Sequence, residues 1–199
     1  PFQSRYVMVE GRAVIYMWST VQMIGDFPSL LDEARSRYPL FFIGSGEGLS
    51  DMNRLKAFDG FMEYGLLGFA GPGGDYQTMV ADYFSYSKIW RSGLQALHEQ
   101  TGKKIYLIPT FQAAYDDTLV KPPRGNNPVY AKSQAEVIEH ARVIKLSMTR
   151  WKIFDNLGPF VVFDEFPEGA AVIPSTRQPE KEGRYVWYGT DRIEIVSKF

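Results

Sequence analysis

Five short apolar runs, separated by segments with helical periodicity, constrain the fold of this chain more than any other feature of its sequence. The runs cover residues 13–18, 40–43, 58–64, 103–110 and 160–163. Helical patterns lie between or after them, over residues 29–38, 78–100, 133–154 and 191–199. Short strands that alternate with helices are typical of a parallel sheet with helical crossovers. The sequence therefore predicts an α/β fold.

Each helical segment should bury one face, because its apolar residues recur at helical spacing. Gly102 should end the second helix, and Ser133 with Glu136 forms a capping box at the start of the third. We expect His98 and His140 on the surface. The side chains expected to face inward are Leu30, Leu31, Ala34, Ala81, Phe84, Ile89, Leu94, Leu97, Ala135, Val137, Ile138, Ala141, Ile144 and Met148.

Composition excludes several classes of function. The chain has 199 residues, which favours one domain over residues 1–199, and a net charge of −1 from 22 basic and 23 acidic residues. That balance gives no electrostatic basis for binding nucleic acid. Cysteine is absent, so disulfides and thiolate metal sites are excluded, and no apolar run reaches the ~18 residues of a membrane span. The compartment stays open; a leader removed before Pro1 would favour a periplasmic or extracellular protein.

Polar and aromatic residues end or follow the predicted strands. The carboxyl ends of parallel strands meet at one face of the sheet, where α/β proteins bind ligands. Trp18, Glu47 and Tyr64 come at the ends of the first three runs, and Asp116 follows the fourth. A complete TIM barrel has eight such strands and about 250 residues. Two architectures stay open: an open sheet, and the C-terminal part of a barrel.

The fifth run has the most strongly charged end. Residues 160–163 are continuously apolar, as in a strand that is buried on both faces. Asp164, Glu165 and Glu168 follow within five residues, and Pro167 makes the turn between them rigid. Two glutamates on such a turn can supply the general acid and base for reaction at a sugar. The alternative is that these carboxylates cap the next helix or simply face water.

Two further features bear on a ligand site. The glycine-rich segment 44–48 lacks the spacing and the Lys-Ser/Thr pair of a P-loop. We interpret it as a loop whose backbone can approach a ligand, with Glu47 as a polar contact; a plain turn is the alternative. Aromatic residues make up 15% of the chain. Since Tyr and Trp combine an apolar ring with a polar tip that suit a sugar face, Trp18 and Tyr64 are candidates for substrate binding.

Several segments resemble glycoside hydrolase family 99 and the related WbsX-like proteins. The stretch 164–169, followed by Ile173-Pro174, resembles the family's last-strand signature. Pro109-Thr110 and the segment 115–118 resemble the segment after its seventh strand, and residues 11–16 resemble its fourth strand. The resemblance covers most of this chain but only the second half of the family's barrel. It implies an α/β fold of the (β/α) TIM-barrel type, incomplete, with about five parallel strands (strands 4 to 8).

The resemblance also implies an activity on an oligosaccharide or polysaccharide. Family 99 enzymes hydrolyse internal α-1,2-mannosidic bonds with retention, and no metal or other cofactor takes part. Carried over, Glu165 would be the base on the sugar 2-hydroxyl, whose oxygen attacks C1 to give a 1,2-anhydro sugar. Glu168 would protonate the leaving oxygen and later activate water. Tyr115, Asp116 and Asp164 would contact the sugar.

The sequence departs from the family pattern at four places. Asp164 replaces the usual Asn, Phe166 replaces Trp, and Ala113-Ala114 replaces Pro-Gly. Ala170-Ala171-Val172 lacks the polar Thr-Gln pair of true endomannosidases. These changes bear on mannose specificity more than on the glutamate pair. The main alternative is a non-catalytic carbohydrate-binding or polysaccharide-assembly protein of the WbsX-like branch. A further alternative is a metal-dependent enzyme whose oxygen ligands would be Asp116, Asp117, Asp164 and Glu165.

A half barrel would leave its first and last strands as exposed edges. The 199-residue chain by itself is therefore expected to be inactive, and to dimerise or aggregate through those edges.

Overall fold

The computed structural model describes residues 6–18, 20, 23–45, 52–66, 69, 76–112 and 134–161. The chain divides into two compact units. Unit 1 comprises Pro1–Tyr64, Ser87–Pro109 and Ile153–Leu157, and unit 2 comprises Gly65–Tyr86, Thr110–Lys152 and Gly158–Phe199. None of the helices within the described ranges is both long and apolar enough to cross a membrane.

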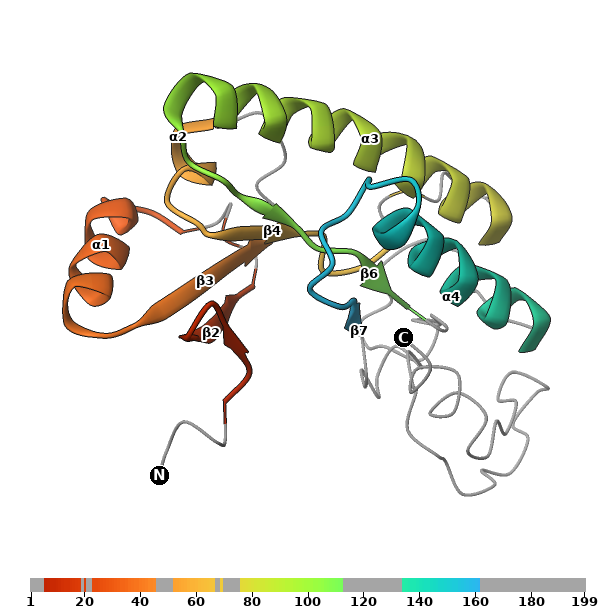
Figure 1. Ribbon diagram of the computed structural model, residues 1–199, viewed down its shortest axis with the longest axis horizontal. Helices are drawn as coiled ribbons and strands as arrows, with labels where there is room; N and C mark the ends of the chain where they lie inside the picture. Colours follow the sequence, from red (N-terminus) through yellow and green to blue (C-terminus); the bar gives the residue numbers. More distant parts are fainter. Residues whose placement is uncertain are drawn as a thin grey trace, which may run out of the picture. The chain divides into compact units, whose positions relative to one another are not determined.

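Unit 1 is built on a five-stranded sheet with the order β1-β2-β3-β4-β5. Strands β2 (Arg12–Met17), β3 (Leu40–Ser45), β4 (Gly60–Met62) and β5 (Tyr106–Leu107) are parallel to one another. Figure 1 shows β2, β3 and β4 side by side, with the helix α1 (Phe27–Arg37) next to β3. The first four predicted runs are therefore strands, as expected.

The strand β1 (Met8–Val9) pairs antiparallel with β2 through a tight turn. Glu10 and Gly11 form the turn with φ angles of 52° and 74°. Two successive positive φ angles are typical of the hairpin turns that match the twist of the strands. Pairing on this side of β2 reaches Val14, whose N–H donates to the carbonyl of Val7 at 2.9 Å.

Helix α1 covers one face of the sheet. Asp26 caps it by accepting a hydrogen bond from the Ser29 N–H, so the helix begins two residues before the predicted start. Phe27 and Leu31 are buried in a cluster with Phe42, Ala57 and Phe58. The prediction that Leu30 faces inward was wrong, since its side chain is 64% exposed.

Helix α3 (Tyr76–Thr101) follows β4 and contributes to both units. In unit 1, Trp90 packs edge-on against Phe61 of β4, with ring centroids 5.4 Å apart. Leu94 and Leu97 are buried as expected, and Gly102, with φ 71°, ends the helix. Ala81 and Ile89 are exposed, which contradicts the prediction for both.

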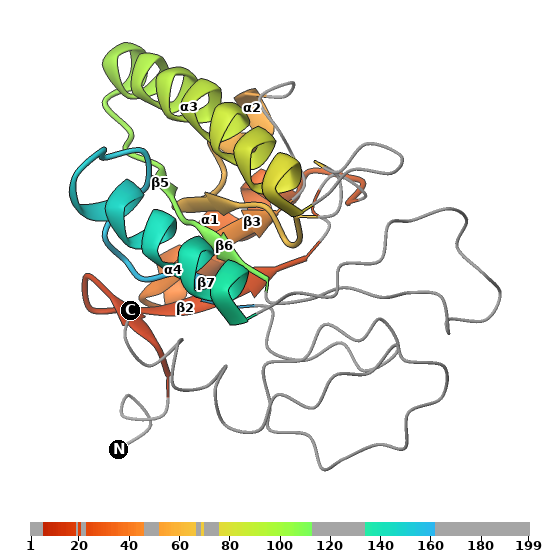
Figure 2. The same cartoon turned by 90° about the vertical axis from the view of Figure 1, so that its right-hand side faces the viewer.

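Unit 2 contains the parallel pair β6 (Thr110–Phe111) and β7 (Phe160–Val161), with the helix α4 (Gln134–Thr149) alongside (Figure 2). The fifth predicted run is thus a strand where it is described. Helix α4 ends at Thr149, five residues before the predicted end. Of its expected inward side chains, Val137, Ile144 and Met148 are buried, whereas Ala135 and Ile138 are exposed.

The fourth predicted strand is divided into β5 and β6 at Ile108-Pro109. Proline has no N–H to donate to a neighbouring strand, so ladder pairing is interrupted there. Asp155 takes the place of a strand partner: its N–H donates to the Leu107 carbonyl, and its Oδ2 accepts from the Leu107 N–H, each at 2.8 Å. Arg91 of α3 donates to the same carboxylate at 2.8 Å.

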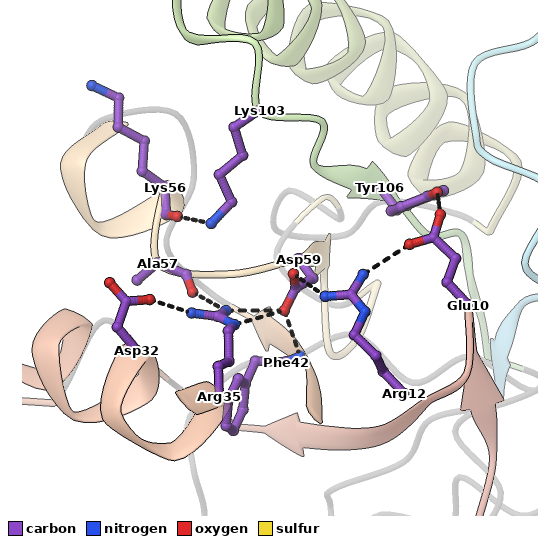
Figure 3. A network of polar contacts seen from close by, with 10 residues as sticks. All are labelled: Glu10, Arg12, Asp32, Arg35, Phe42, Lys56, Ala57, Asp59, Lys103 and Tyr106. Carbon is purple, nitrogen blue, oxygen red and sulfur yellow. Dashed lines mark hydrogen bonds and ion pairs between the residues drawn. The ribbon is translucent and has the colours of Figure 1, made fainter. Parts of the chain in front are cut away.

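Asp59, which directly precedes β4, connects β2, β3 and the last turn of α1 (Figure 3). Its carboxylate accepts from Arg12 of β2 at 2.7 Å, from Arg35 of α1 at 2.9 Å, and from the Phe42 N–H of β3 at 2.9 Å. Burial acts to raise the pKa of Asp59, but the hydrogen bonds from Phe42, Arg12 and Arg35 outweigh it and hold the pKa below its usual value. The network joins two strands and a helix at the amino ends of the sheet.

In unit 1, β2, β3, β4 and β5 are parallel strands, and in unit 2, β6 and β7 form a parallel pair. This is an α/β fold of the TIM-barrel type with an incomplete set of strands, as predicted.

Candidate functional site

Two of the eight predicted site residues, Trp18 and Tyr64, lie within the described residues. The other six lie outside them, so their roles stay predictions: Glu47, Tyr115, Asp116, Asp164, Glu165 and Glu168.

Trp18 and Tyr64 come together at the carboxyl ends of β2 and β4. Trp18 directly follows β2, and Tyr64 lies two residues after β4. Their ring centroids are 5.8 Å apart with an angle of 60° between the planes. Tyr16 of β2 stacks on Tyr64 at 6.5 Å with nearly parallel rings. Trp18 is 65% exposed. The strand ends thus present an aromatic surface with the indole on its outer side.

The reason for this grouping is strand alternation. Side chains at i and i+2 of a strand point to the same face, so Tyr16 and Trp18 lie together on the face opposite α1. Ser45 ends the intervening strand β3, and the Tyr16 hydroxyl donates to its Oγ at 3.1 Å. The aromatic rings therefore sit beside hydroxyl groups. A sugar needs this combination of an apolar ring face and polar groups that bond its hydroxyls.

Glu63 is a titratable residue that the sequence analysis did not consider. It lies between the end of β4 and Tyr64 and is half-buried. Burial raises its pKa to about 7. A carboxyl group with such a pKa carries its proton in weakly acidic solution and can then donate a hydrogen bond. The signal was present in the sequence as an acid at a strand end, but the predicted strand ran to Tyr64 and included it.

The two histidines differ. His98 is exposed near the end of α3, as predicted. His140 was also expected on the surface, and this was wrong: it is 1% exposed and packs against Phe111, with ring centroids 5.1 Å apart. Its position three residues after Val137 and four before Ile144 places it on the buried stripe of α4. That spacing could have corrected the prediction.

No group of three or more potential metal ligands occurs among the residues that the structure describes. The four carboxylates of the metal-dependent alternative lie outside them, so that alternative is not tested.

No family model and no curated protein matches this sequence. Nineteen solved chains match the structure. A "glycoside hydrolase-like protein" superposes with a TM-score of 0.73 at 15% identity, over 98% of this chain and 56% of its own.

Two structures of a GH99 endo-alpha-mannosidase from Bacteroides thetaiotaomicron also match. Each has a TM-score of 0.62, at 15% and 17% identity, over 96% of this chain. One of them is a complex with bis-tris-propane. This chain covers 59% and 55% of their lengths, so it spans a little over half of the structures it resembles. The resemblance expected from the sequence is confirmed as a similarity of fold: the chain has a glycosidase-like fold.

Proposed function

We propose that this chain belongs to a glycoside hydrolase that acts on α-linked, mannose-type glycans with retention of configuration. The observation that carries the proposal is the similarity of fold to glycoside hydrolases over nearly the whole chain. Two features support it. Trp18 and Tyr64 make an aromatic surface at the carboxyl ends of β2 and β4, and Glu165 and Glu168 follow the last apolar run in the sequence.

In this proposal Glu165 removes the proton from the sugar 2-hydroxyl, and the resulting oxygen attacks C1 as the glycosidic bond breaks. Glu168 gives its proton to the leaving oxygen. Water, deprotonated by Glu168, then opens the 1,2-anhydro sugar at C1, and the 2-oxygen recovers a proton from Glu165. Configuration at C1 is inverted twice and so retained. Trp18 and Tyr64 stack on the sugar, while Glu47, Tyr115, Asp116 and Asp164 bind its hydroxyls.

The test is Glu168→Gln in the intact protein, with an α-mannoside whose leaving group is a sugar. General acid catalysis typically contributes about 10²–10⁴-fold, so turnover should fall by that order. A fluoride leaving group needs no protonation in the first step, so kcat/KM for a glycosyl fluoride should fall much less, although the second step still lacks its base. Glu139→Gln is the matched control, because Glu139 is exposed on α4 and pairs with Arg142. Unchanged turnover by Glu168→Gln would remove Glu168 from the mechanism.

Two outcomes would favour the alternatives. Binding of the glycan by calorimetry, with no product after long incubation of the intact protein, would indicate a carbohydrate-binding or polysaccharide-assembly protein. Activity that is lost with EDTA and restored by a divalent metal would indicate the metal-dependent enzyme. We expect activity to survive EDTA, and the 199-residue chain by itself to show no turnover.

A further inference from the structure

Arg54 bonds the loop that carries Trp18. It lies in α2 (Met52–Leu55), which follows β3, whereas the loop follows β2. Both terminal nitrogens of its guanidinium donate to the carbonyl of Met23, each at 3.1 Å, and Nη2 also donates to the carbonyl of Thr20. The guanidinium lies over the ring of Phe27, 4.6 Å from its centroid. The Arg54 side chain therefore contacts two backbone carbonyls of the loop and also the first residue of α1.

The same loop is also bonded to β3. The Thr20 hydroxyl is fully buried and donates to the Ser45 carbonyl at 2.7 Å. Within the loop, the Met23 N–H donates to the Thr20 carbonyl at 3.0 Å. Trp18 lies two residues before Thr20. Its indole, which is 65% exposed and contacts Tyr64, is thus attached to a backbone that is bonded at Thr20 and Met23.

Arg54 can act as a rigid support because its own segment is anchored. The next residue, Leu55, is fully buried. The Arg54 carbonyl accepts from the Ala57 N–H, and the Leu55 carbonyl accepts from the Phe58 N–H, each at 3.0 Å. A lysine could not make the same contacts, because an ammonium lacks the planar fork that donates several hydrogen bonds while it stacks on a ring.

We propose that Arg54 is a positioning residue that fixes the loop after β2 and thereby holds Trp18 beside Tyr64. Its consequence for sugar binding rests on the proposed function; its effect on Trp18 does not. Arg54 touches no sugar in this proposal, and it acts through the Thr20 and Met23 carbonyls.

The test is ¹⁹F NMR of the protein labelled with 5-fluorotryptophan, with lines assigned by Trp18→Phe and Trp90→Phe. In Arg54→Met the Trp18 line should shift and broaden, while the line of Trp90, buried against Phe61, should stay in place. Arg54→Lys keeps the charge and should displace the Trp18 line less. Arg37→Met is the matched control, because Arg37 is an exposed arginine of α1 that pairs with Glu33; it should leave both lines unchanged.

Two results would overturn the proposal. One is a Trp18 line that is unchanged in Arg54→Met. The other is equal displacement of the Trp18 and Trp90 lines in both Arg54 variants, which would mean that Arg54 stabilises the whole unit and not this loop.

Glycan binding tests the positioning role of Arg54 separately from the proposed function. With an α-linked mannotetraose as probe, Arg54→Met should weaken binding about fivefold, the scale of one lost stacking contact. Trp18→Ala with Arg54→Met should bind no more weakly than Trp18→Ala, because Arg54 acts through Trp18. Additive losses of glycan affinity would contradict the inference that Arg54 acts through Trp18. A wild-type protein that binds no glycan, while Arg54→Met still displaces the Trp18 line, would contradict the proposed function and support the positioning role.

Discussion

Asp59 accepts hydrogen bonds from two arginines that come from different elements, and this makes its charge costly to remove. In Asp59→Asn, Arg12 and Arg35 keep their charges and lose their shared partner. Breaking a buried ion pair from one side typically costs about 3 kcal/mol, which should appear as a lower midpoint in urea unfolding. Asp32→Asn is the matched control: Asp32 also pairs with Arg35 but is exposed, so the cost should stay below about 1 kcal/mol. Equal losses would show that burial of Asp59 is unimportant.

The same residue sets a pH dependence. The pKa of Asp59 is held below its usual value in the folded protein. Its contribution to stability is therefore complete above the unfolded pKa of about 4 and is lost as the pH falls further. Unfolding followed from pH 5 to pH 2 should show a steeper loss of stability in the wild type than in Asp59→Asn. Parallel curves would contradict the low pKa.

Glu63 should act in the opposite sense. Its pKa is raised to about 7 by burial, so the folded protein retains a proton that the unfolded chain has released. Stability should then decline as the pH rises from about 4.5 to 7, by about 2 kcal/mol after allowance for the half-exposed side chain. Glu63→Gln should abolish this decline in urea unfolding between pH 5 and pH 8. Glu99→Gln, at an exposed position of α3, should retain it.

For single residues, the sequence indicated which side chains have suitable chemistry better than it indicated how deeply each one is buried. Trp18 and Tyr64 were selected as aromatic residues at strand ends, and the structure brings their rings together. Glu63 was not among the predicted site residues, and His140 was wrongly expected on the surface, because burial depends on elements far along the chain. The periodicity of α4 alone could have corrected His140, whereas the environment of Glu63 requires the tertiary fold.

At the level of the elements, the close packing of β3 against Phe58 requires a glycine at position 44. A Cβ on Gly44 would lie 2.9 Å from three carbons of the Phe58 ring, and Phe58 is fully buried. Gly44→Ala should therefore lower the free energy of unfolding by about 2 kcal/mol, the usual scale of overpacking. The double variant Gly44→Ala, Phe58→Leu should lose less than the sum of the single changes, because the smaller side chain makes room. Additive losses in chemical denaturation would contradict the clash.

The type of each element could be predicted from the sequence, but the buried face of each helix could be predicted less well. All five apolar runs contain parallel strands, because short apolar runs between helices carry a clear pattern. The division of the fourth run was not predicted, although Pro109 within it was a local signal, whereas the bond between Leu107 and Asp155 depends on a residue far along the chain. Leu30 was placed inward because it follows the helical period, yet Phe27 and Leu31 fill the space against Phe42 and Phe58. Neighbouring residues of a helix lie about 100° apart around its axis, so Leu30 points away from the face that Leu31 buries.

The sheet of unit 1 has an edge at β2 that β1 covers only in part. Such an edge favours pairing with another chain. The 199-residue chain by itself should therefore show concentration-dependent association in sedimentation velocity. Val7→Lys should shift it toward monomer, because Val7 is 74% exposed and lies next to the edge. Leu30→Lys replaces an apolar residue on α1 that is 64% exposed, and it should not change the association. A chain that stays monomeric at all concentrations would contradict edge pairing.

The order of strands in this sheet, β1-β2-β3-β4-β5, is also their order along the chain. During synthesis each strand therefore leaves the ribosome next to a partner that is already complete, and no strand has to insert between two that have paired. Each new strand is added at one edge of the sheet, beside the strand that was made before it. A nascent chain of this design can add to its sheet one strand at a time, without waiting for its C-terminal end.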